Sequence, residues 1–372
     1  MARPHLLVAV DGIVTVPELL ETIDAIAAVQ LPDGNVPWTP GAHTDPWNLV
    51  EAAMALDLGG RQDEARGAYD WLARCQRADG GWHAYYLGDE VEDQTLDTNV
   101  TCYVATGAWH HHLVTGDTAL LRAQWDSVEA AIDFALDFQR PTGEISWRGD
   151  DPDDGALLTG SSSIHLSLRC ALAIAARLGH HRPDWELSLG ALAIAIAHRP
   201  DVFLDKQRWA MDWYYPVLGG VLRGYPADAR VVKGWPDFVV EGRGVRCVSD
   251  RPWVTAAETC ELVMALDAIG HHGPARDLYR WVQFLRADGG GYWTGANFED
   301  EAFEREGELY PVEQPTWNSA AVVLAAHALA GDGPTAGLFR GERLPKGLDA
   351  DELLAAGVEI AAERECATEP LD

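Results

Sequence analysis

The sequence predicts an all-α protein whose helices form an (α/α)6 toroid, a ring of alternating outer and inner helices. A turn rich in Gly, Pro and Trp recurs before helices of small apolar residues, as at 45–48, 251–253 and 314–318. The segment Met-Ala-Leu-Asp also occurs twice, at 54–57 and 264–267. Repeated helical hairpins bury their apolar faces only by stacking on neighbours, so the recurrence favours a closed ring with loops gathered around one mouth.

The predicted outer helices are amphipathic, with charged residues on one side and apolar residues on the other. They span 17–30, 62–76, 117–139, 184–198 and 274–286. Several end in a related phrase in which Gln30, Gln76 or Gln139 is followed by a Gly and then a Trp. The Gly is expected to supply a left-handed helix cap, and the Trp to pack back on the hairpin.

The predicted inner helices are small, apolar and almost uncharged after the first turn, which indicates burial on all sides. They span 46–56, 98–114, 160–178, 213–222, 254–270 and 316–330. The stretch 224–250 is the exception in the pattern, because Pro226, Gly234 and Pro236 leave little room for the outer helix expected there. The barrel domain is predicted over 1–345, followed by an acidic C-terminal helix or tail over 346–372.

Charge and cysteine content limit the partners of the chain. A formal charge of −30 makes nucleic acid and anionic membrane surfaces poor partners, since both attract cations. The six cysteines show no CxxC spacing, and no apolar run approaches the length of a membrane span. We therefore expect a cytoplasmic protein without a metal or other cofactor. The sequence gives no indication of the oligomeric state.

Aromatic residues and carboxylates gather in the loops that precede the inner helices. The chain has 15 Trp and 10 Tyr, and aromatic faces pack well on the C–H faces of sugar rings. An oligo- or polysaccharide is therefore the expected substrate. The candidate substrate-binding residues are Trp47, Asn48, Asp97, Asn99, Asp212, Trp213, Tyr214, Trp253, Glu313 and Trp317.

Glu258 and Asp45 are the predicted catalytic pair. Glu258 stands alone in an apolar helix near the mouth, where a buried charge must be either partnered or functional. Asp45 precedes Pro46, so it is a candidate helix cap, and the helix N-terminus would stabilise its ionised form, which fits a base better than an acid. Glu258 is thus expected to donate a proton to the leaving oxygen and Asp45 to activate water, with inversion favoured. Glu51 and Glu261 lie at the same distance before the two copies of the Met-Ala-Leu-Asp segment, which favours a structural role for both.

The chain resembles six-hairpin glycosidases over about 20–340. The stretch 313–320 is similar to the opening of the last inner helix of glucoamylases, which implies a substrate-site role for Glu313. The segments 43–48, 211–220 and 247–258 resemble more closely an actinobacterial group represented by the methylmannose polysaccharide hydrolase. That resemblance implies hydrolysis of internal α-1,4 bonds between O-methylated mannoses. The alternative enzyme of this class is an α-glucan hydrolase of the glucoamylase type.

A second resemblance points to different chemistry. The segment 76–82 fits the QW motif of terpene cyclases and prenyltransferases, and 151–154 fits the DxDD motif of class II cyclases. Asp151 and its neighbours lie in a Gly/Asp-rich loop, however, where a solvated acidic turn is the usual structure. A toroid that binds a carbohydrate or lipid without catalysis is the third class. Loss of turnover on alanine substitution of Glu258 or Asp45 would distinguish an enzyme from a binder.

Overall fold

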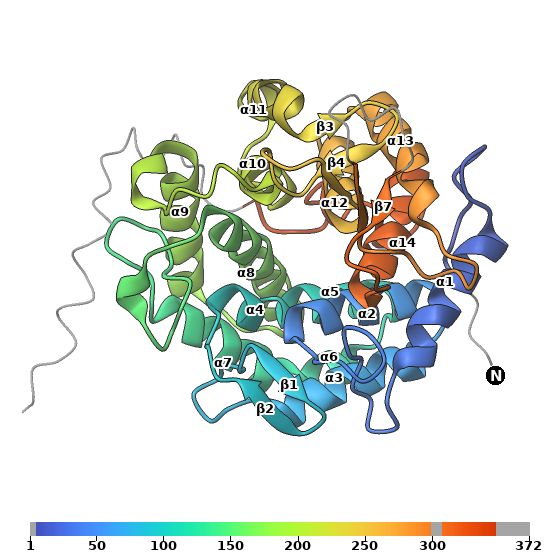
Figure 1. Cartoon of the computed structure of the whole chain (residues 1–372). Helices are drawn as coiled ribbons and strands as arrows, with labels where there is room; N and C mark the ends of the chain where they lie inside the picture. The colour runs from blue at the N-terminus through green and yellow to red at the C-terminus, as the bar shows by residue number, and fades with distance from the viewer. Residues whose placement is uncertain (1–4, 299–306, 347–372) are drawn as a thin grey trace, which may run out of the picture.

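The computed structural model describes residues 5–298 and 307–346, and these are mostly helical (Figure 1). The inner helices form a closed ring in which each packs on the next, in the order α2, α5, α8, α10, α12, α14 and back to α2. Almost every residue of these helices is buried, as their composition predicts. They are α2 (Pro46–Leu58), α4 (Thr98–Cys102), α5 (Val104–Thr115), α8 (Leu158–Leu178), α10 (Ala210–Leu218), α12 (Ala256–Ala268) and α14 (Thr316–Ala330).

A second layer of helices surrounds this ring (Figure 1). Packing joins α3 to α2, α7 to α4, α9 to α8, α11 to α10, α13 to α12, and α1 to α14. The outer helices are α1 (Val16–Val29), α3 (Gln62–Cys75), α6 (Thr118–Ala123), α7 (Trp125–Leu136), α9 (Pro183–His198), α11 (Gly224–Phe238) and α13 (His272–Trp281). The described residues therefore form a helical toroid of two layers. The predicted C-terminal helix or tail lies, from residue 347, outside them.

The prediction for 224–250 is wrong, because an outer helix, α11, does form there. Pro226 is its third residue, where a backbone N–H has no partner within the helix in any case. Pro236 lies only two residues before the helix ends at Phe238. Gly234 lets α11 approach α10, since a Cβ at this position would lie 2.5 Å from the Trp213 ring.

Three inner helices begin at residues other than those the sequence predicts, and the third begins at Leu158 rather than 160. The fourth begins at Ala210 rather than 213, so that Asp212 lies in its first turn. The fifth begins at Ala256, because Trp253–Thr255 form the strand β5. Glu258 consequently lies in the first turn of α12 and at the end of the helix that faces the connecting loops.

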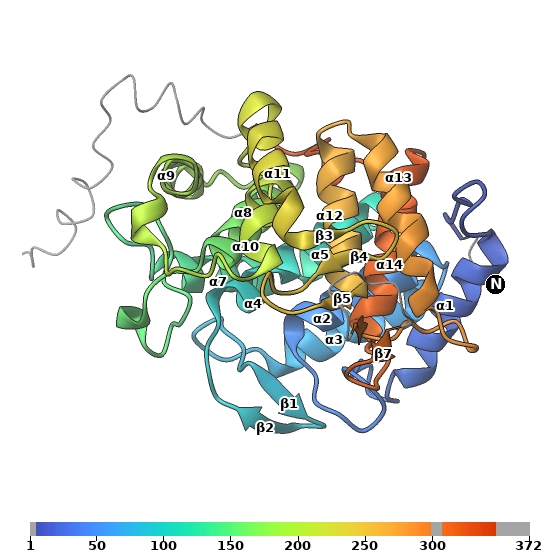
Figure 2. The ribbon, with the colours of Figure 1, turned by 45° about the horizontal axis from the view of Figure 1, so that its top comes forward.

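The sequence did not predict the short strands that join the loops. A hairpin of β1 (Tyr85–Leu87) and β2 (Glu90–Asp93) projects beside α3 and α4, and β3 to β5 lie near α11 and α12 (Figure 2). Each strand has two to four residues, so these sheets tie loops together and do not form a separate domain. The five-stranded antiparallel sheet has the order β3-β4-β5-β6-β7. Besides β5, it contains β3 (Val239–Val240), β4 (Gly244–Arg246), β6 (Gly295–Asn297) and β7 (Glu308–Leu309).

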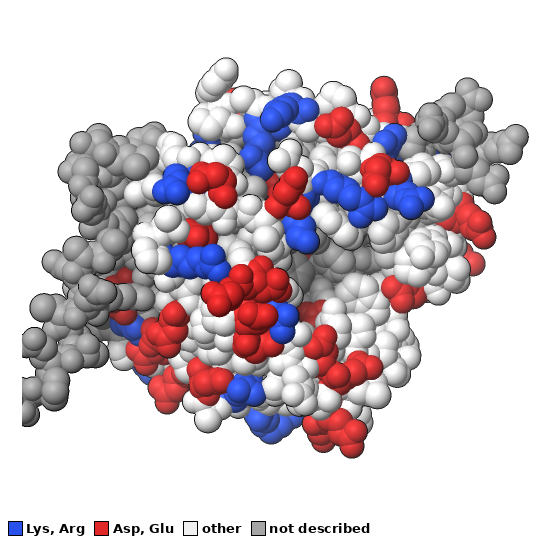
Figure 3. Space-filling view, turned by 60° about the vertical axis from the view of Figure 1, so that its left-hand side comes forward, with Lys and Arg blue, Asp and Glu red and all other residues white. Residues whose placement is uncertain are grey.

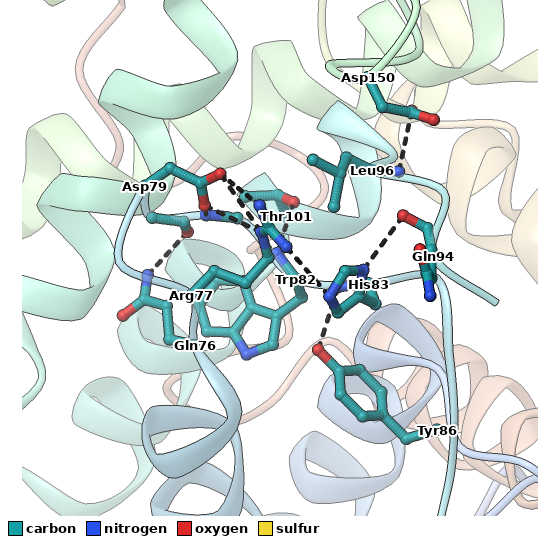
Figure 4. A network of polar contacts seen from close by, with 12 residues as sticks. Gln76, Arg77, Asp79, Trp82, His83, Tyr86, Gln94, Leu96, Thr101 and Asp150 are labelled. Carbon is teal, nitrogen blue, oxygen red and sulfur yellow. Dashed lines mark hydrogen bonds and ion pairs between the residues drawn. The ribbon is translucent and has the colours of Figure 1, made fainter. Parts of the chain in front are cut away.

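The repeated Gln-to-Gly phrase connects consecutive outer helices. The Gln76 amide donates to the Ser127 carbonyl of α7 at 2.9 Å. It also donates to the Gly80 carbonyl at 2.8 Å, the contact drawn from Gln76 in Figure 4. Gln30 bridges in the same way to α3, through Glu64, and Gln139 bridges to α9, through Ser188. Each Gln therefore closes its own turn and holds the next outer helix at the same time.

The last such turn follows α13 and contacts α1, the first helix of the chain. Arg286 stands where the other turns have Gln, and its guanidinium donates to the Glu21 carboxylate of α1 at 2.5 Å. Thr22 of α1 donates its hydroxyl to the Gly290 carbonyl at 2.8 Å. The outer layer is thus closed between α1 and the segment that follows α13. No helix among the described residues is long and apolar enough to cross a bilayer.

Candidate active site

The loops that precede the inner helices meet at one end of the toroid. Each loop is joined to a neighbour by a backbone hydrogen bond or bridge, which connects the inner helices into a continuous mouth. The bonds are Thr316 to Trp38 at 2.9 Å, Thr44 with Tyr86, Thr98 to Trp147 at 3.0 Å, Leu204 to Ala156 at 2.9 Å, Ala210 to Cys247 at 3.0 Å and Ala256 to Thr294 at 2.9 Å. Side chains at the N-terminal ends of α2, α4, α8, α10, α12 and α14 are therefore brought to the same end.

Asp45 is the N-cap of α2 and is 9% exposed. Its carboxylate accepts the backbone N–H of Asn48 at 2.8 Å, and the Asn48 amide also donates to it. Burial raises the pKa of Asp45 to about 7, more than these hydrogen bonds lower it, and the charge of Asp97 raises it further. The backbone N–H groups at the helix N-terminus do lower the pKa of Asp45, as expected, but desolvation outweighs them.

Asp97 repeats this arrangement on the next inner helix. It is the N-cap of α4 and accepts the backbone N–H of Val100 at 2.9 Å, while burial raises its pKa to about 6. Both carboxylates are near Tyr85 of β1, whose pKa is raised by burial and then by the charges of Asp45, Asp93 and Asp97. Tyr85 is 39% exposed. The two caps and this tyrosine thus form one acidic part of the mouth.

Glu258 is 6% exposed in the first turn of α12. The thiol of Cys247, in the loop after β4, hydrogen-bonds to Glu258, and burial together with this carboxylate raises the thiol pKa. The charge of Glu258 also raises the pKa of Glu261, one turn deeper in the same helix, and that of Tyr214. Glu258 is the outermost member of a buried acidic group on α12.

Buried carboxylates below Glu258 are held by tyrosine hydroxyls. Tyr215 donates to Glu261 at 2.6 Å and Tyr214 donates to the same carboxylate, while Tyr103 donates to Glu51 at 2.6 Å. Burial raises the pKa of Glu51 to about 7 and that of Glu261 far above its usual range. Both side chains are 1% exposed, which agrees with the structural role expected from the repeat.

Aromatic rings surround the Asp45 end of the mouth. Trp47 stacks on Tyr103 with centroids 4.4 Å apart, and Trp317 lies 5.9 Å from Trp47 and 5.8 Å from Trp38. His43 lies 4.3 Å from Tyr85. Four of these aromatic residues were not among the predicted site residues: Trp38, His43, Tyr85 and Tyr103. The recurrence of Trp38 in the Gln-Gly-Trp phrase favoured a packing role for it, although it lies beside Trp317.

Some predicted substrate-binding residues lie near Asp45 and others do not. Asn48, Trp47, Asp97 and Trp317 are in its vicinity, and Glu313 accepts the Trp38 indole N–H at 3.2 Å. Asn99 lines a cavity of about 90 Å³ together with Asp97 and Trp147.

The remaining candidates lie elsewhere at the rim or in the core. The Trp253 indole donates to the Tyr310 carbonyl at 2.7 Å, in the loop before α14. Trp213 is directed into α11, where it stacks on Phe238, and Tyr214 is completely buried. Asp212 and Trp213 line a separate cavity between α10 and α11.

The acidic stretch 151–154 has a structural explanation. Asp151–Asp154 form an exposed acidic turn around the short 3-10 helix η1 (Pro152–Asp154), as the loop composition predicts.

No group of three or more His, Cys, Asp or Glu side chains within 5–298 and 307–346 is arranged to hold a metal ion. Acidic and basic side chains are mixed on the face that Figure 3 brings forward.

Known proteins share this fold. A wild-type glycosidase superposes with a TM-score of 0.63 at 15% identity, covering 85% of this chain and 96% of its own. A GH63 mannosylglycerate hydrolase from Thermus thermophilus, in complex with glucose, has a TM-score of 0.63 at 10% identity and covers 83% and 99%. No family model matches the chain.

A sequence relative is more informative than these folds. The MMP endo-(1,4)-3-O-methyl-alpha-D-mannosidase of Mycolicibacterium hassiacum is 48% identical over 344 residues, which is 92% of this chain and 94% of that protein. With a glycosidase fold and this degree of identity, the chain is a glycoside hydrolase. It belongs to the family of the M. hassiacum endo-mannosidase, which confirms the resemblance seen in the sequence.

Proposed function

We propose that this enzyme hydrolyses internal (1,4)-linked α-mannosidic bonds in a polymer of 3-O-methylmannose, and that its toroid is an (α/α)6 barrel. The 48% identity to the M. hassiacum endo-mannosidase over 92% of the chain carries the proposal. The alternating inner and outer helices support the barrel assignment. The described cysteines are all free, which supports a cytosolic location.

Asp45 and Glu258 are the catalytic carboxylates in this proposal. Both lie in or before the first turn of an inner helix at the mouth, and both are at least nine-tenths buried. Helix α14 packs against both α2 and α12, so the two carboxylates belong to non-adjacent inner helices. Glycoside hydrolysis needs such a pair, one to donate a proton and one to act on water or on the anomeric carbon.

The roles that the structure favours are the reverse of those expected from the sequence. A pKa of about 7 leaves a large fraction of Asp45 protonated at neutral pH, as a proton donor requires. Asp45 then protonates the glycosidic oxygen as the bond to the anomeric carbon breaks. Glu258 accepts a proton from the water whose oxygen attacks that carbon. Each product takes one part of the water, so the reaction balances without a further reagent.

The aromatic side chains near Asp45 supply a surface for the sugar chain. Sugar C–H faces and methyl ethers are apolar, and both pack favourably on indole and phenol rings. Trp38, Trp317 and Tyr85 retain exposed surface in this region, whereas Trp47 is nearly buried and supports them. Asn48 and Asp97 are the polar side chains available there for hydroxyl groups.

The placement of the carboxylates on non-adjacent helices supports inversion. Inverting pairs lie about 6.5–9.5 Å apart to leave room for water, whereas retaining pairs lie about 5–5.5 Å apart. Proton NMR of the first product to form would show the β-anomer of the new reducing end if the α-linkage is inverted. Initial release of the α-anomer would establish retention and assign Glu258 the role of nucleophile.

A substrate panel tests the proposal directly. The enzyme would be incubated with 3-O-methylated α-mannan, unmethylated α-mannan and α-1,4-glucan, and the products sized over time. We expect the methylated mannan to be cut fastest, with intermediate-length products at early times. Preferential cleavage of α-1,4-glucan would instead establish the glucoamylase-type activity, and release of monosaccharides alone would contradict internal cleavage.

A further inference from the structure

A cavity of about 420 Å³ lies between α10, α11 and the loop that precedes α10. It is formed at the mouth end of the α10–α11 hairpin, since it includes the start of α10 and the second half of α11. Its polar lining comprises Asp205, Gln207, Asp212, Arg230, Lys233 and Asp237. Proposed catalysis by Asp45 and Glu258 uses none of these residues.

The wall of this cavity is held rigidly by hydrogen bonds between α10 and α11. The Arg230 guanidinium donates to the carbonyls of Trp213 at 2.7 Å and Asp212 at 2.6 Å. The Trp213 indole donates in return to the Arg230 carbonyl at 2.8 Å. The Trp213 ring stacks on Phe238 at 5.3 Å with an interplanar angle of 12°. The cavity is therefore formed before any ligand binds.

The lining favours a neutral, hydroxyl-rich ligand. Three carboxylates, Asp205, Asp212 and Asp237, face two cations, Arg230 and Lys233. Arg230 is committed to backbone carbonyls, so an anion would meet a net acidic cavity on a chain with a formal charge of −30. Carboxylates accept from sugar hydroxyls, Lys233 can donate to them, and the apolar walls suit sugar C–H and methyl groups.

The wall of the cavity is linked to the Asp45 region by contacts between side chains at the mouth. Asp212 is 5% exposed and accepts the Thr159 hydroxyl of α8 at 3.1 Å. Thr159 also lines the smaller cavity that contains Asp97, and the charge of Asp97 acts on Asp45. The cavity therefore lies at the same end of the toroid as Asp97 and Asp45.

We propose that the α10–α11 cavity is a distal subsite that binds a sugar segment of the polysaccharide away from the cleaved bond. This inference rests on the proposed function, because it assigns the site to the same substrate chain. An endo-acting enzyme must hold a chain on both sides of the cleaved bond, and the cavity provides a preformed neutral-sugar site on one side.

Substrate length distinguishes this role from a structural one. Lys233 and Asp237 are exposed on α11, where alanine is well tolerated, so we would compare Lys233→Ala and Asp237→Ala with the wild type. The matched control is Lys206→Ala. Lys206 is an exposed lysine in the loop before α10, and its side chain does not line the cavity. We expect each cavity variant to raise KM for the long polymer about 10- to 150-fold, in line with a lost hydrogen bond to a charged group. We expect little change in kcat, and no change for the shortest oligomer that is still cleaved.

The outcomes separate this inference from the proposed function. Equal kinetic constants for variants and wild type on every substrate length would overturn the distal subsite and leave the function intact. Equal losses on short and long substrates would also overturn it, in favour of a structural role for these residues. If the wild type cleaves no methylmannan, calorimetry with neutral α-mannan and α-glucan oligosaccharides still decides the site. Binding weakened by Lys233→Ala but not by Lys206→Ala supports it, and binding equal in both contradicts it.

Discussion

At the scale of single residues, the contacts of a side chain set its role at the mouth. Asp45 caps a helix, yet burial raises its pKa to about 7, and this supports its assignment as the proton donor. Three consecutive positions of α10 also differ in role because their contacts differ. Asp212 hydrogen-bonds to α8, Trp213 packs on α11, and Tyr214 hydrogen-bonds to Glu261 of α12. Of the three, Asp212 is the polar side chain that lines a cavity.

The pH dependence of the reaction reports the role of Asp45. A proton donor with a pKa of about 7 is lost as the pH rises, so kcat/KM should fall about tenfold per pH unit above pH 7. The profile would be measured from about pH 5 to 9 on the polymer. If Asp45 were instead the base, as its helix-cap position alone suggests, kcat/KM would rise with pH up to about 7 and would not fall with the loss of the Asp45 proton. A profile that rises up to about pH 7 and stays level above it would therefore reverse the assignment.

The sequence indicates that Asp45 and Glu258 belong to the site, because a carboxylate at the start of an apolar helix is unusual. Their division of labour could not be predicted, because it depends on the burial of Asp45.

Glu51 is predicted to make stability depend on pH. Burial raises its pKa from 4.5 to about 7, so the folded state holds the proton more tightly than the unfolded state. This stabilisation is complete below about pH 4.5 and is lost as the pH rises to about 7 and above. We therefore expect Glu51→Gln to gain about 3 kcal/mol relative to the wild type between about pH 4.5 and pH 8, at about 1.36 kcal/mol per pKa unit. Urea unfolding of both proteins at several pH values measures this difference in the free energy of unfolding. A difference that does not vary with pH would show that the pKa of Glu51 is the same in the folded and unfolded states.

At the scale of elements, the outer layer depends on turns that combine a glutamine with a left-handed glycine. The sequence prediction that these glycines cap the outer helices is wrong, because Gln30 and Gln76 are the C-caps and the left-handed Gly34 and Gly80 lie later, in the turn. Their missing Cβ atoms allow contact with the next outer helix. A Cβ on Gly80 would lie 2.2 Å from the Ala130 carbonyl oxygen, and one on Gly34 equally close to Gly67. The inner helices were predictable because their apolar character is local. The existence of α11 was not, because it depends on packing of Gly234 against Trp213 from a different helix.

A pair of glycine variants separates backbone strain from close packing. Gly80 and Gly88 both have positive φ, 92° and 61°, but a Cβ on Gly88 would meet nothing within 4 Å. Gly88→Ala should therefore cost only about 1–2 kcal/mol for the left-handed conformation. Gly80→Ala should cost clearly more, since α7 must also move away. Equal losses in chemical denaturation would show that the turn does not hold α7 through this contact.

At the scale of the whole molecule, closure of the two layers brings distant loops to one mouth. Inner helix α14 packs on α2, and the turn after α13 binds α1 through Arg286, Thr22 and Gly290. The hairpin repeat made a closed ring predictable. The strands β3 to β7 were not predictable, because each has only two or three residues, and the sheet joins β3 to β5 of one loop to β6 and β7 of another.

The proposed function requires that Asp45 and Glu258 act as the acid and the base of a hydrolase. The direct test is kcat/KM for internal cleavage of the (1,4)-linked 3-O-methylmannose polymer by Asp45→Asn and Glu258→Gln. Asn caps helices as well as Asp does, so Asp45→Asn should fold, and Asp117→Asn, at the N-cap of α6, is the matched control. We expect a loss of about 10²–10⁴-fold for each catalytic variant and none for the control. Retention of more than about a tenth of wild-type activity by either catalytic variant would contradict it.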